Sequence, residues 1–496
     1  LTLVEAHRMG GDCLNTGCVP SKALIRAAGI AHEMRQGAGY GVRATEVTVD
    51  FPAVMARVAQ VVRDIELHDS PERYRSLGVD VQLGQARIVD PWHVEITHPD
   101  GQTTRLSTRA IVIATGARPV VPPLPGLQEA GVLTSDTLWG LQELPRRLLV
   151  LGGGPIGCEL AQAFARLGAK VTLLEIGSRL LPREDEEVSA HARQHLEADG
   201  VHVLTGHRAL RCERLQGAVA ASSDHAAAQV GASLAREQLS GSAESWSLVT
   251  EHGGVEHQLP FDRILCAVGR QARLEGFGLE ALGIATNGRA LPVDEHLQTV
   301  FPHILACGDV AGPYQFTHAA AHQAWYAAVN GLFGTFRRFK VDHRVIPWCT
   351  FTDPEIARVG LNEQDAREQG VPYEVTRFDL GDLDRMIVEG WRGAGRMTEE
   401  ADTHEEGHAG WIQVLTVPGK DRILGVTIVG CHAGELIAEW VLALKHGLGL
   451  NQVLGTIHVY PTLAESAKYA AGAWKRAHQP LALLRWVERF HAWRRG

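Results

Sequence analysis

Residues 147–161 leave little choice of fold, because an apolar run, a glycine-rich turn and a helix-forming segment follow one another there. Gly152, Gly154 and Gly157 have Gly-x-Gly-x-x-Gly spacing. In such a turn the first glycine makes the bend, the second lets the backbone approach a pyrophosphate, and the third allows close helix–strand packing. A second apolar run ends in an acid, Glu175, 18 positions after Gly157. This arrangement predicts a parallel α/β sheet with a dinucleotide site at its carboxyl edge.

The acid at position 175 also indicates which dinucleotide binds. A carboxylate at the end of this strand accepts hydrogen bonds from the free ribose hydroxyls of NAD and repels a 2′-phosphate. Arg179 and Arg183 lie close enough in the sequence to offset part of that repulsion. We expect NAD(H) to be favoured over NADP(H).

Cys13 and Cys18 are the second concentration of chemistry in the chain. They lie five positions apart in a glycine-rich turn that runs through Pro20 into the first turn of a helix. A helix N-terminus lowers the pKa of a nearby thiol, and Lys22 adds a full positive charge. This geometry permits a strained, reversible disulfide, so redox chemistry is the favoured interpretation.

Two other interpretations of the cysteine pair stay open. The pair could be half of a zinc site, although the remaining cysteines stand alone without ligand spacing. The two thiols could also be buried and inert, but a glycine-rich turn before a proline-containing helix does not favour that. The remaining cysteines are at positions 158, 212, 266, 307, 349 and 431.

The composition excludes several classes of protein. A chain of 496 residues is long enough for roughly two to four domains. The net charge of -9 is spread without long runs, which argues against nucleic acid as the main partner. Eight cysteines are too few for a disulfide-stapled secreted protein, so we expect a cytoplasmic location. Because no run of about 18 uncharged apolar residues occurs, we also expect no membrane span.

The segment GGDCLNTGCVPSKALI, residues 10–25, resembles the redox-active segment of the pyridine nucleotide-disulfide oxidoreductases. These flavoproteins include dihydrolipoamide dehydrogenase and mercuric reductase, and the resemblance recurs in order to residue 469. It implies an α/β fold with two Rossmann-like dinucleotide-binding domains, for FAD and NAD(P), and a C-terminal α+β dimerisation domain. It also implies a Cys13–Cys18 disulfide, with Cys18 as the thiolate against the flavin and Cys13 as the interchange thiol that attacks the substrate.

The same resemblance divides the chain into segments. The FAD-binding domain takes residues 1–145 and 273–343, on either side of an NAD(P)-binding domain at 146–272. A dimerisation domain follows at 344–470 and a helical tail at 471–496. Residues 213–258 are rich in Ala, Ser, Gln and Gly, so we expect an enlarged hairpin there.

Many positions match the contacts that the family makes with flavin and nicotinamide. The resemblance implies that Lys22 and Glu159 pair beside the flavin ring, where they tune the flavin and position the nicotinamide. Asp309 follows a strand and a glycine, from which it can reach a ribityl hydroxyl, and His318 is expected to pack on the flavin side. The cofactor-binding positions are Glu5, Gly11, Lys22, Ala86, Thr115, Gly116, Ala117, Gly152, Gly154, Gly157, Glu159, Glu175, Gly269, Asp309, Phe316, Thr317 and His318.

The segment HVYPTLAE, residues 458–465, resembles the acid–base motif of the family. A histidine exchanges protons near neutral pH, and a carboxylate partner raises its basicity and fixes its tautomer. We expect Pro461 to start a helix on which Glu465 orients the imidazole of His458. The resemblance implies that this pair completes the active site of the other subunit of a homodimer.

The first five residues predict a buried strand that ends in Glu5, an acid placed to hold a ribose hydroxyl. The glycine motif that should precede such a strand is missing from the sequence. We therefore expect roughly 30 further residues upstream, which complete a βαβ unit. The missing motif also motivates a second hypothesis, in which the protein is a flavin-deficient, non-catalytic partner subunit.

The expected function is that of an FAD-dependent NAD(P)H:disulfide/dithiol oxidoreductase, most like dihydrolipoamide dehydrogenase, acting on a small-molecule or protein-bound disulfide or dithiol. Reduction of Hg(II), as in mercuric reductase, is the alternative. That enzyme should carry a cysteine pair near its C-terminus, whereas the last cysteine here is Cys431. The expected catalytic residues are Cys13, Cys18, Lys22, Glu159, His458 and Glu465.

The remaining expectations concern structure. In residues 391–410 a solvated loop is favoured over a metal pair formed by His404 and His408, so no metal site is expected. The helix at 481–495 is expected to pack against the protein rather than lie on a membrane surface. Further helices are expected at 45–78 and 434–446, and strands at 79–83, 86–97, 103–107, 110–117, 411–417 and 422–429.

Overall fold

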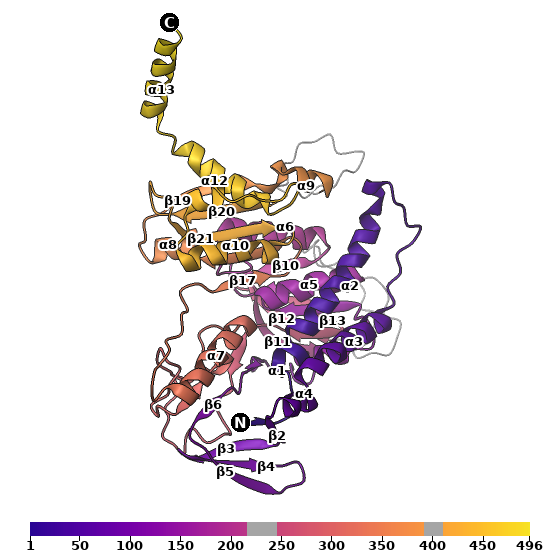
Figure 1. Ribbon diagram of the computed structural model, residues 1–496. Helices are drawn as coiled ribbons and strands as arrows, with labels where there is room; N and C mark the ends of the chain where they lie inside the picture. Colours follow the sequence, from indigo (N-terminus) through magenta and orange to yellow (C-terminus); the bar gives the residue numbers. More distant parts are fainter. Residues whose placement is uncertain (216–245, 391–409) are drawn as a thin grey trace, which may run out of the picture.

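A computed structural model describes residues 1–215, 246–390 and 410–496. Within these ranges the sheets lie in three groups along the length of the molecule, with the parallel sheet in the middle (Figure 1). His404, His408 and the tip of the expected hairpin lie outside the described residues.

The middle group is the expected parallel α/β sheet. Its strand order is β10 (His202–Thr205), β9 (Lys170–Glu175), β8 (Arg147–Leu151) and β14 (Arg263–Cys266). The helix α5 (Pro155–Leu167) follows β8 and packs on the sheet, and α6 (Glu186–Ala198) follows β9. Beside this sheet, β11 (Arg208–Arg214), β12 (Trp246–His252) and β13 (Val255–Phe261) form an antiparallel sheet. The described part of residues 213–258 therefore agrees with a hairpin.

The N-terminal group consists of short strands and helices. The redox segment forms α1 (Gly11–Asn15) and α2 (Cys18–Gln36), and β3 (Gln85–Asp90), β4 (His93–Thr97) and β5 (Thr103–Ser107) make an antiparallel sheet at one end of the molecule (Figure 1). The remaining pairs are β6 (Ile111–Ile113) with β16 (Ile304–Ala306) and β7 (Ala117–Pro119) with β15 (Arg270–Ala272). The helix α7 (Thr317–Phe333) packs over β6 and β16.

Three expectations for this group were wrong, one in burial and two in the extent of an element. The strand β1 (Thr2–Glu5) is not buried, because it pairs only with β2 (Asp80–Leu83) in a two-stranded sheet whose edges stay open. The strand expected at 110–117 is interrupted, because β6 ends at Ile113 and β7 begins at Ala117. The helix expected at 45–78 is two helices, α3 (Phe51–Asp69) and α4 (Pro71–Ser76), because Ser70 is extended and its hydroxyl caps the second one.

The C-terminal group is a five-stranded antiparallel sheet covered by helices. Its order is β17 (Pro347–Thr350), β18 (Glu355–Gly360), β21 (Ile423–Gly430), β20 (Trp411–Thr416) and β19 (Glu374–Asp379). The helices α10 (Ala433–His446) and α12 (Glu465–Ala477) pack on it, and Trp440 is fully buried in its core. Shorter helices are α8 (Glu363–Glu368), α9 (Asp384–Val388) and α11 (Leu450–Leu454).

A polar stripe on α5 joins the parallel sheet to the C-terminal sheet. Glu159, Gln162 and Arg166 follow one another at helical spacing and meet the segment that leaves β17. Gln162 accepts a 2.8 Å hydrogen bond from the Asp353 amide and donates one to its carbonyl, and Arg166 Nη1 lies 2.8 Å from the Asp353 carboxylate. The two sheets are therefore held together by a paired polar contact.

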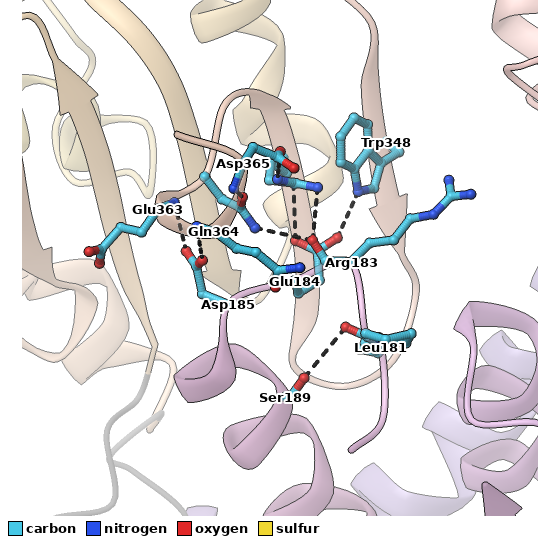
Figure 2. Close-up of polar contacts among 12 residues, drawn as sticks. Leu181, Arg183, Glu184, Asp185, Ser189, Trp348, Glu363, Gln364 and Asp365 are labelled. Carbon is cyan, nitrogen blue, oxygen red and sulfur yellow. Dashed lines mark hydrogen bonds and ion pairs between the residues drawn. The ribbon is translucent and has the colours of Figure 1, made fainter. Parts of the chain in front are cut away.

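A buried ion cluster makes a second junction between the same two sheets (Figure 2). Glu184 accepts a 2.9 Å hydrogen bond from the Trp348 indole and lies 3.2 Å from Arg358, which is 2 % exposed. Arg358 also pairs with Asp365 at 2.5 Å. Burial raises the pKa of Glu184, and the positive charge of Arg358 opposes that shift. The cluster thus depends on each charge having its partner.

The C-terminal helix α13 (Leu481–Arg494) differs from its expectation. None of its residues is buried, and Figure 1 shows it projecting from the end of α12, away from the body of the protein. The expectation that it packs against the protein was therefore wrong within the described chain. Among the described helices, none combines the length and the apolar character that crossing a bilayer needs.

Candidate active site

The two cysteines meet because the chain between them folds tightly. Cys13 lies in α1 and Cys18 opens α2. A Cβ at Gly17 would lie 2.9 Å from the Asp12 carbonyl oxygen and 3.3 Å from Cys13 Cα, so only glycine lets the two segments approach this closely. The local sequence therefore sets the distance between the thiols.

The two thiols have opposite proton affinities. Both are free, and Cys13 donates a hydrogen bond to Cys18. That bond, with smaller contributions from Thr317 and Lys22, lowers the pKa of Cys18 to about 5, although burial opposes it. The same bond raises the pKa of Cys13. In the dithiol form the negative charge thus rests on Cys18.

The charge on Cys18 faces the beginning of α7. Its Sγ atom lies 3.5 Å from Thr317 Oγ1, in the first turn of that helix. No side chain caps this N-terminus, which Phe316 precedes, so its amide groups are directed at the site. His318 Nε2 donates a 2.8 Å hydrogen bond to the Pro347 carbonyl, and its ring stacks on Phe316.

The expected Lys22–Glu159 ion pair is present. Lys22 Nζ lies 2.8 Å from Glu159 Oε2, and the Glu159 side chain is only 7 % exposed. The second oxygen, Oε1, accepts a 2.9 Å hydrogen bond from the Phe351 amide, and the Phe351 ring lies 4.4 Å below the ammonium group. The pair therefore joins the redox helix, the nucleotide-binding helix and the C-terminal sheet at one point.

Asp309 lies in the turn that follows β16, as expected, and has a partner that the sequence did not reveal. Arg270, at the start of β15, lies 3.6 Å from Asp309 and also pairs with Asp12 beside Cys13. Burial raises the pKa of Asp309, and Arg270 opposes the shift. Arg270 therefore links Asp309 to the segment that carries the two cysteines.

The residues on this side fit an FAD. Gly11 and Gly116 have positive φ angles of 60° and 69°, and a Cβ at Gly11 would meet no atom within 4 Å. Together with the uncapped α7 and the partly buried Asp309, they leave open backbone and polar groups around Cys18. The other expected contacts lie on β1 (Glu5), β3 (Ala86), the turn before β7 (Thr115), β7 (Ala117) and the turn before β15 (Gly269).

The glycine turn after β8 has the expected form. Gly152 has a φ angle of 105°, and a Cβ at Gly157 would lie 1.9 Å from the Gly152 carbonyl oxygen. Open space surrounds Gly154, which begins an uncapped α5. Glu175 ends β9 and accepts 2.6 Å hydrogen bonds from the Gly153 and Gly177 amides. The turn thus fits a pyrophosphate at the helix N-terminus and a ribose beside Glu175.

The expected contact between His458 and Glu465 is absent, so the predicted acid–base pair is wrong. His458 Nε2 lies 3.0 Å from Glu439 on α10, Nδ1 lies 3.2 Å from the Thr456 carbonyl, and the His458 side chain is 6 % exposed. Glu465 instead accepts a 3.3 Å hydrogen bond from the Thr462 amide. Pro461 precedes an irregular turn, and the helix begins four residues later than expected, with Glu465 in its first turn.

No local pattern in the sequence pointed to Glu439, Arg270 or Tyr460. Glu439 is 19 residues from His458 and reaches it only through the packing of α10. Tyr460 is 64 % exposed and donates a 2.8 Å hydrogen bond to Asp384. It is the titratable side chain most open to solvent in the described loop between α11 and α12.

Known proteins resemble this chain over nearly its whole length. A mercuric reductase of Streptomyces lividans is 33% identical over 475 residues, which cover 95% of this chain and 90% of that protein. A dihydrolipoyl dehydrogenase of Thermus scotoductus is 34% identical over 473 residues, covering 95% and 91%.

Solved structures agree with the fold. LpdA from Mycobacterium tuberculosis has a TM-score of 0.79 at 23% identity and covers 95% of this chain and 93% of its own. The HOCl-induced flavoprotein disulfide reductase RclA from Escherichia coli has a TM-score of 0.74 at 26% identity, with the same coverage.

The family profiles match both parts of the chain. Residues 1–324 match the pyridine nucleotide-disulphide oxidoreductase profile, and residues 346–471 match the dimerisation domain of the same proteins. Family members use FAD and NAD(P), and the dimerisation domain implies a homodimer. The chain belongs to the pyridine nucleotide-disulphide oxidoreductase family.

Proposed function

We propose that the protein is an FAD-dependent, NADH-preferring oxidoreductase that exchanges electrons between nicotinamide and a disulfide or dithiol substrate, most like dihydrolipoyl dehydrogenase. The observation that supports it is the asymmetric Cys13–Cys18 pair, whose thiolate lies between Thr317 and Lys22. A low-pKa thiol beside a second thiol is the arrangement that disulfide exchange needs. Such chemistry suits the reducing cytoplasm.

Asp309, the α7 N-terminus and the glycine positions 11 and 116 would hold the FAD, and the turn at Gly152–Gly157 would hold NADH. Bound FAD would supply the step that converts a hydride into two electrons for the disulfide. Lys22 and Glu159 place one fixed positive and one fixed negative charge beside that step. Because both charges are paired, they orient nicotinamide without adding a net charge to the site.

The chain's own thiols carry the second half of the reaction. Two electrons and one proton would open the Cys13–Cys18 disulfide to the Cys18 thiolate and the Cys13 thiol, as expected from the lowered pKa of Cys18 and the raised pKa of Cys13. Loss of the Cys13 proton gives a thiolate that attacks the substrate disulfide and displaces one substrate thiolate, which takes up a proton. Cys18 then attacks Cys13, releasing the second thiolate, which also takes up a proton, and restoring the disulfide.

The group that moves the proton would be His458 of the partner subunit. Its Nδ1 lies 3.2 Å from the Thr456 carbonyl and its Nε2 lies 3.0 Å from the Glu439 carboxylate, so both ring nitrogens have a polar partner that fixes the orientation of the ring. Because the His458 side chain is buried against Glu439, the imidazole must separate from that carboxylate before it can reach a substrate thiolate. Glu439 therefore takes the orienting role that the sequence had suggested for Glu465.

The preference for NADH is supported by the surroundings of Arg179. An open pocket of about 670 Å³ beyond Glu175 is lined by Arg179 and Arg367, the cations that a 2′-phosphate would use. Arg179 instead contacts Glu186 at 3.4 Å and Gln364 at 2.5 Å. Arg367 lies 3.4 Å from Glu363. Since both cations already have acidic partners, the repulsion from Glu175 is not offset.

A visible absorbance scan of the full-length protein tests the proposal. Bound flavin that develops a long-wavelength band on reduction is expected; Cys18→Ser should abolish that band, and Cys13→Ser should keep it while stopping dithiol turnover. A purified protein that binds no added FAD would overturn the proposed enzymatic function and favour the hypothesis of a flavin-deficient partner subunit. Dithiol turnover retained in Cys13→Ser would contradict the assignment of the two thiols.

Reduction of Hg(II) is the second candidate, because a mercuric reductase is among the relatives. The last cysteine of the chain, Cys431, is buried and lies 3.5 Å from the Met386 sulfur. It is therefore not placed to deliver a metal ion. Parallel NADH turnover with lipoamide, glutathione disulfide and Hg(II) separates the candidates, since only the first two need thiol exchange at Cys13.

A further inference from the structure

The helix α13 presents one apolar face that nothing in the described chain covers. Leu483, Trp486, Val487, Phe490 and Trp493 recur at three- and four-residue intervals, so they share that face. Trp486 is 61% exposed and Trp493 76% exposed, and the rings of Trp486 and Phe490 stack at 5.7 Å. Leu481 and Leu484 add exposed apolar surface in the first turn.

The opposite side of the helix is basic. Arg485 and Arg489 lie there with a single acid, Glu488, while Arg494 and Arg495 follow at the end. The helix is thus strongly positive, although the whole chain carries a net charge of -9. Tryptophan and phenylalanine on one face with arginine on the other is the pattern of helices that lie in the interface of a bilayer.

The helix α13 lies apart from the body of the protein (Figure 1) and outside the matched dimerisation domain. Residues 478–480 join it to α12, and it projects from the end of the molecule (Figure 1). The dimerisation domain matches residues 346–471 and ends before it.

We propose that α13 binds the surface of an anionic phospholipid bilayer, with the tryptophan face in the headgroup region and the arginines against the lipid phosphates. The positive charge of the helix is complementary to such a surface and unlike the rest of the chain. A homodimer carries two copies of α13, and binding of both to one bilayer would strengthen attachment by raising the effective concentration of the second helix. The enzyme would thus act at a membrane surface without a spanning helix.

Co-sedimentation of the FAD-loaded full chain with vesicles tests this proposal. The probes are phosphatidylcholine vesicles and vesicles with equal parts of phosphatidylcholine and phosphatidylglycerol, at low salt and at about 1 M salt, where the Debye length is about 3 Å. The variants are Trp486→Ser/Trp493→Ser and Arg485→Glu/Arg489→Glu. The matched controls are Phe336→Ser, an exposed apolar residue outside α13, and Arg43→Glu/Arg57→Glu, the same charge change on the body. NADH oxidation serves as the folding control.

We expect the protein and both controls to sediment with the anionic vesicles at low salt, and both α13 variants to lose at least tenfold in vesicle affinity with NADH oxidation unchanged. Absence of sedimentation with either vesicle overturns the proposal, as does binding that the α13 variants leave intact. Light scattering tests whether the apolar face of α13 instead contacts a second copy of the chain. If Trp486→Ser/Trp493→Ser converts dimers to monomers, the face belongs to that second copy and the proposal is wrong.

Discussion

Lys22 on the redox helix and Glu159 on the nucleotide-binding helix meet at 2.8 Å, and the Phe351 amide holds the second oxygen of the same carboxylate. Two elements separated by more than a hundred residues are therefore tied by one charge pair. Because the Glu159 side chain is almost fully buried, water does not compete strongly for either contact.

Glu159→Gln should slow flavin reduction by NADH about 10- to 100-fold. The change removes a charge-assisted hydrogen bond of about 1.5–3 kcal/mol. Stopped-flow absorbance under anaerobic conditions measures the step. Glu33→Gln is the control, because the Arg26–Glu33 pair on the same helix as Lys22 is exposed and should leave the rate unchanged. Equal rates in Glu159→Gln and wild type would show that the pair is not used in this step.

Alkylation of the reduced protein should begin at unusually low pH. Since the pKa of Cys18 is lowered to about 5, iodoacetamide should modify this residue with a midpoint near that pH. Cys13→Ala removes the hydrogen bond that is the largest cause of the shift, so the midpoint should move upward. Peptide mass spectrometry identifies the modified residue. The control is Cys266→Ala, which should leave the midpoint unchanged, because burial raises the pKa of the Cys266 thiol. An unchanged midpoint in Cys13→Ala would refute this origin.

Glu439→Gln and Glu465→Gln should separate the two carboxylates near the acid–base loop. Glu439→Gln takes the acceptor charge from His458 and should shift the pH profile of dithiol turnover. Glu465→Gln weakens a hydrogen bond at the start of α12 and should lower the unfolding free energy by about 1 kcal/mol without moving the profile. Steady-state rates across pH, with urea unfolding, measure both; a profile shifted only by Glu465→Gln contradicts the assignment.

Arg358→Met should destabilise the protein by about 3–5 kcal/mol, because it leaves Glu184 buried without its counter-charge. The pKa of Glu184 is already raised by burial, and losing Arg358 raises it further. A carboxyl with a raised folded pKa binds its proton more tightly when folded, so stability falls as pH rises through that window.

The loss of unfolding free energy in Arg358→Met should therefore be smaller at about pH 5 than at about pH 8. Urea unfolding at both values checks it. Arg193→Met, which breaks an exposed pair with Glu197 on α6, should cost at most about 1 kcal/mol at either pH. A deficit that does not depend on pH would mean that Glu184 stays charged in the variant.

Glu186→Gln should improve the use of NADPH about two- to fivefold in kcat/KM, with little change for NADH. It releases Arg179 from its acidic partner in the pocket that both residues line. Glu197→Gln, on the same helix and paired with Arg193, is the matched control. If NADPH gains nothing, Gln364 and the Pro182 carbonyl alone hold Arg179 away.

Sequence reasoning succeeded where chemistry is local. The Cys13–Cys18 turn and the turn at Gly152–Gly157 each lie within a few residues, so spacing alone determines which groups meet. The Lys22–Glu159 pair was also predicted, although from the resemblance, since 137 residues separate the two. The parallel order of β8 and β9 followed from the strand–turn–helix pattern.

The failures share one physical cause, which is that partners come from distant elements. Nothing around His458 indicates that α10 brings Glu439 to it. Arg270 reaches Asp309 and Asp12 only after three segments pack together. The amphipathic pattern of α13 identifies an apolar face but not what covers it, and packing against the protein was the wrong choice.

The Phe351 contact has a consequence for protein synthesis. Lys22 and Glu159 leave the ribosome long before residue 351, so an unfinished chain carries both charges without the amide that fixes one carboxylate oxygen. The Asp353 backbone, which grips Gln162 on the same helix, also arrives late. The complete contact among Lys22, Glu159 and Phe351 therefore forms only after the C-terminal sheet has been translated.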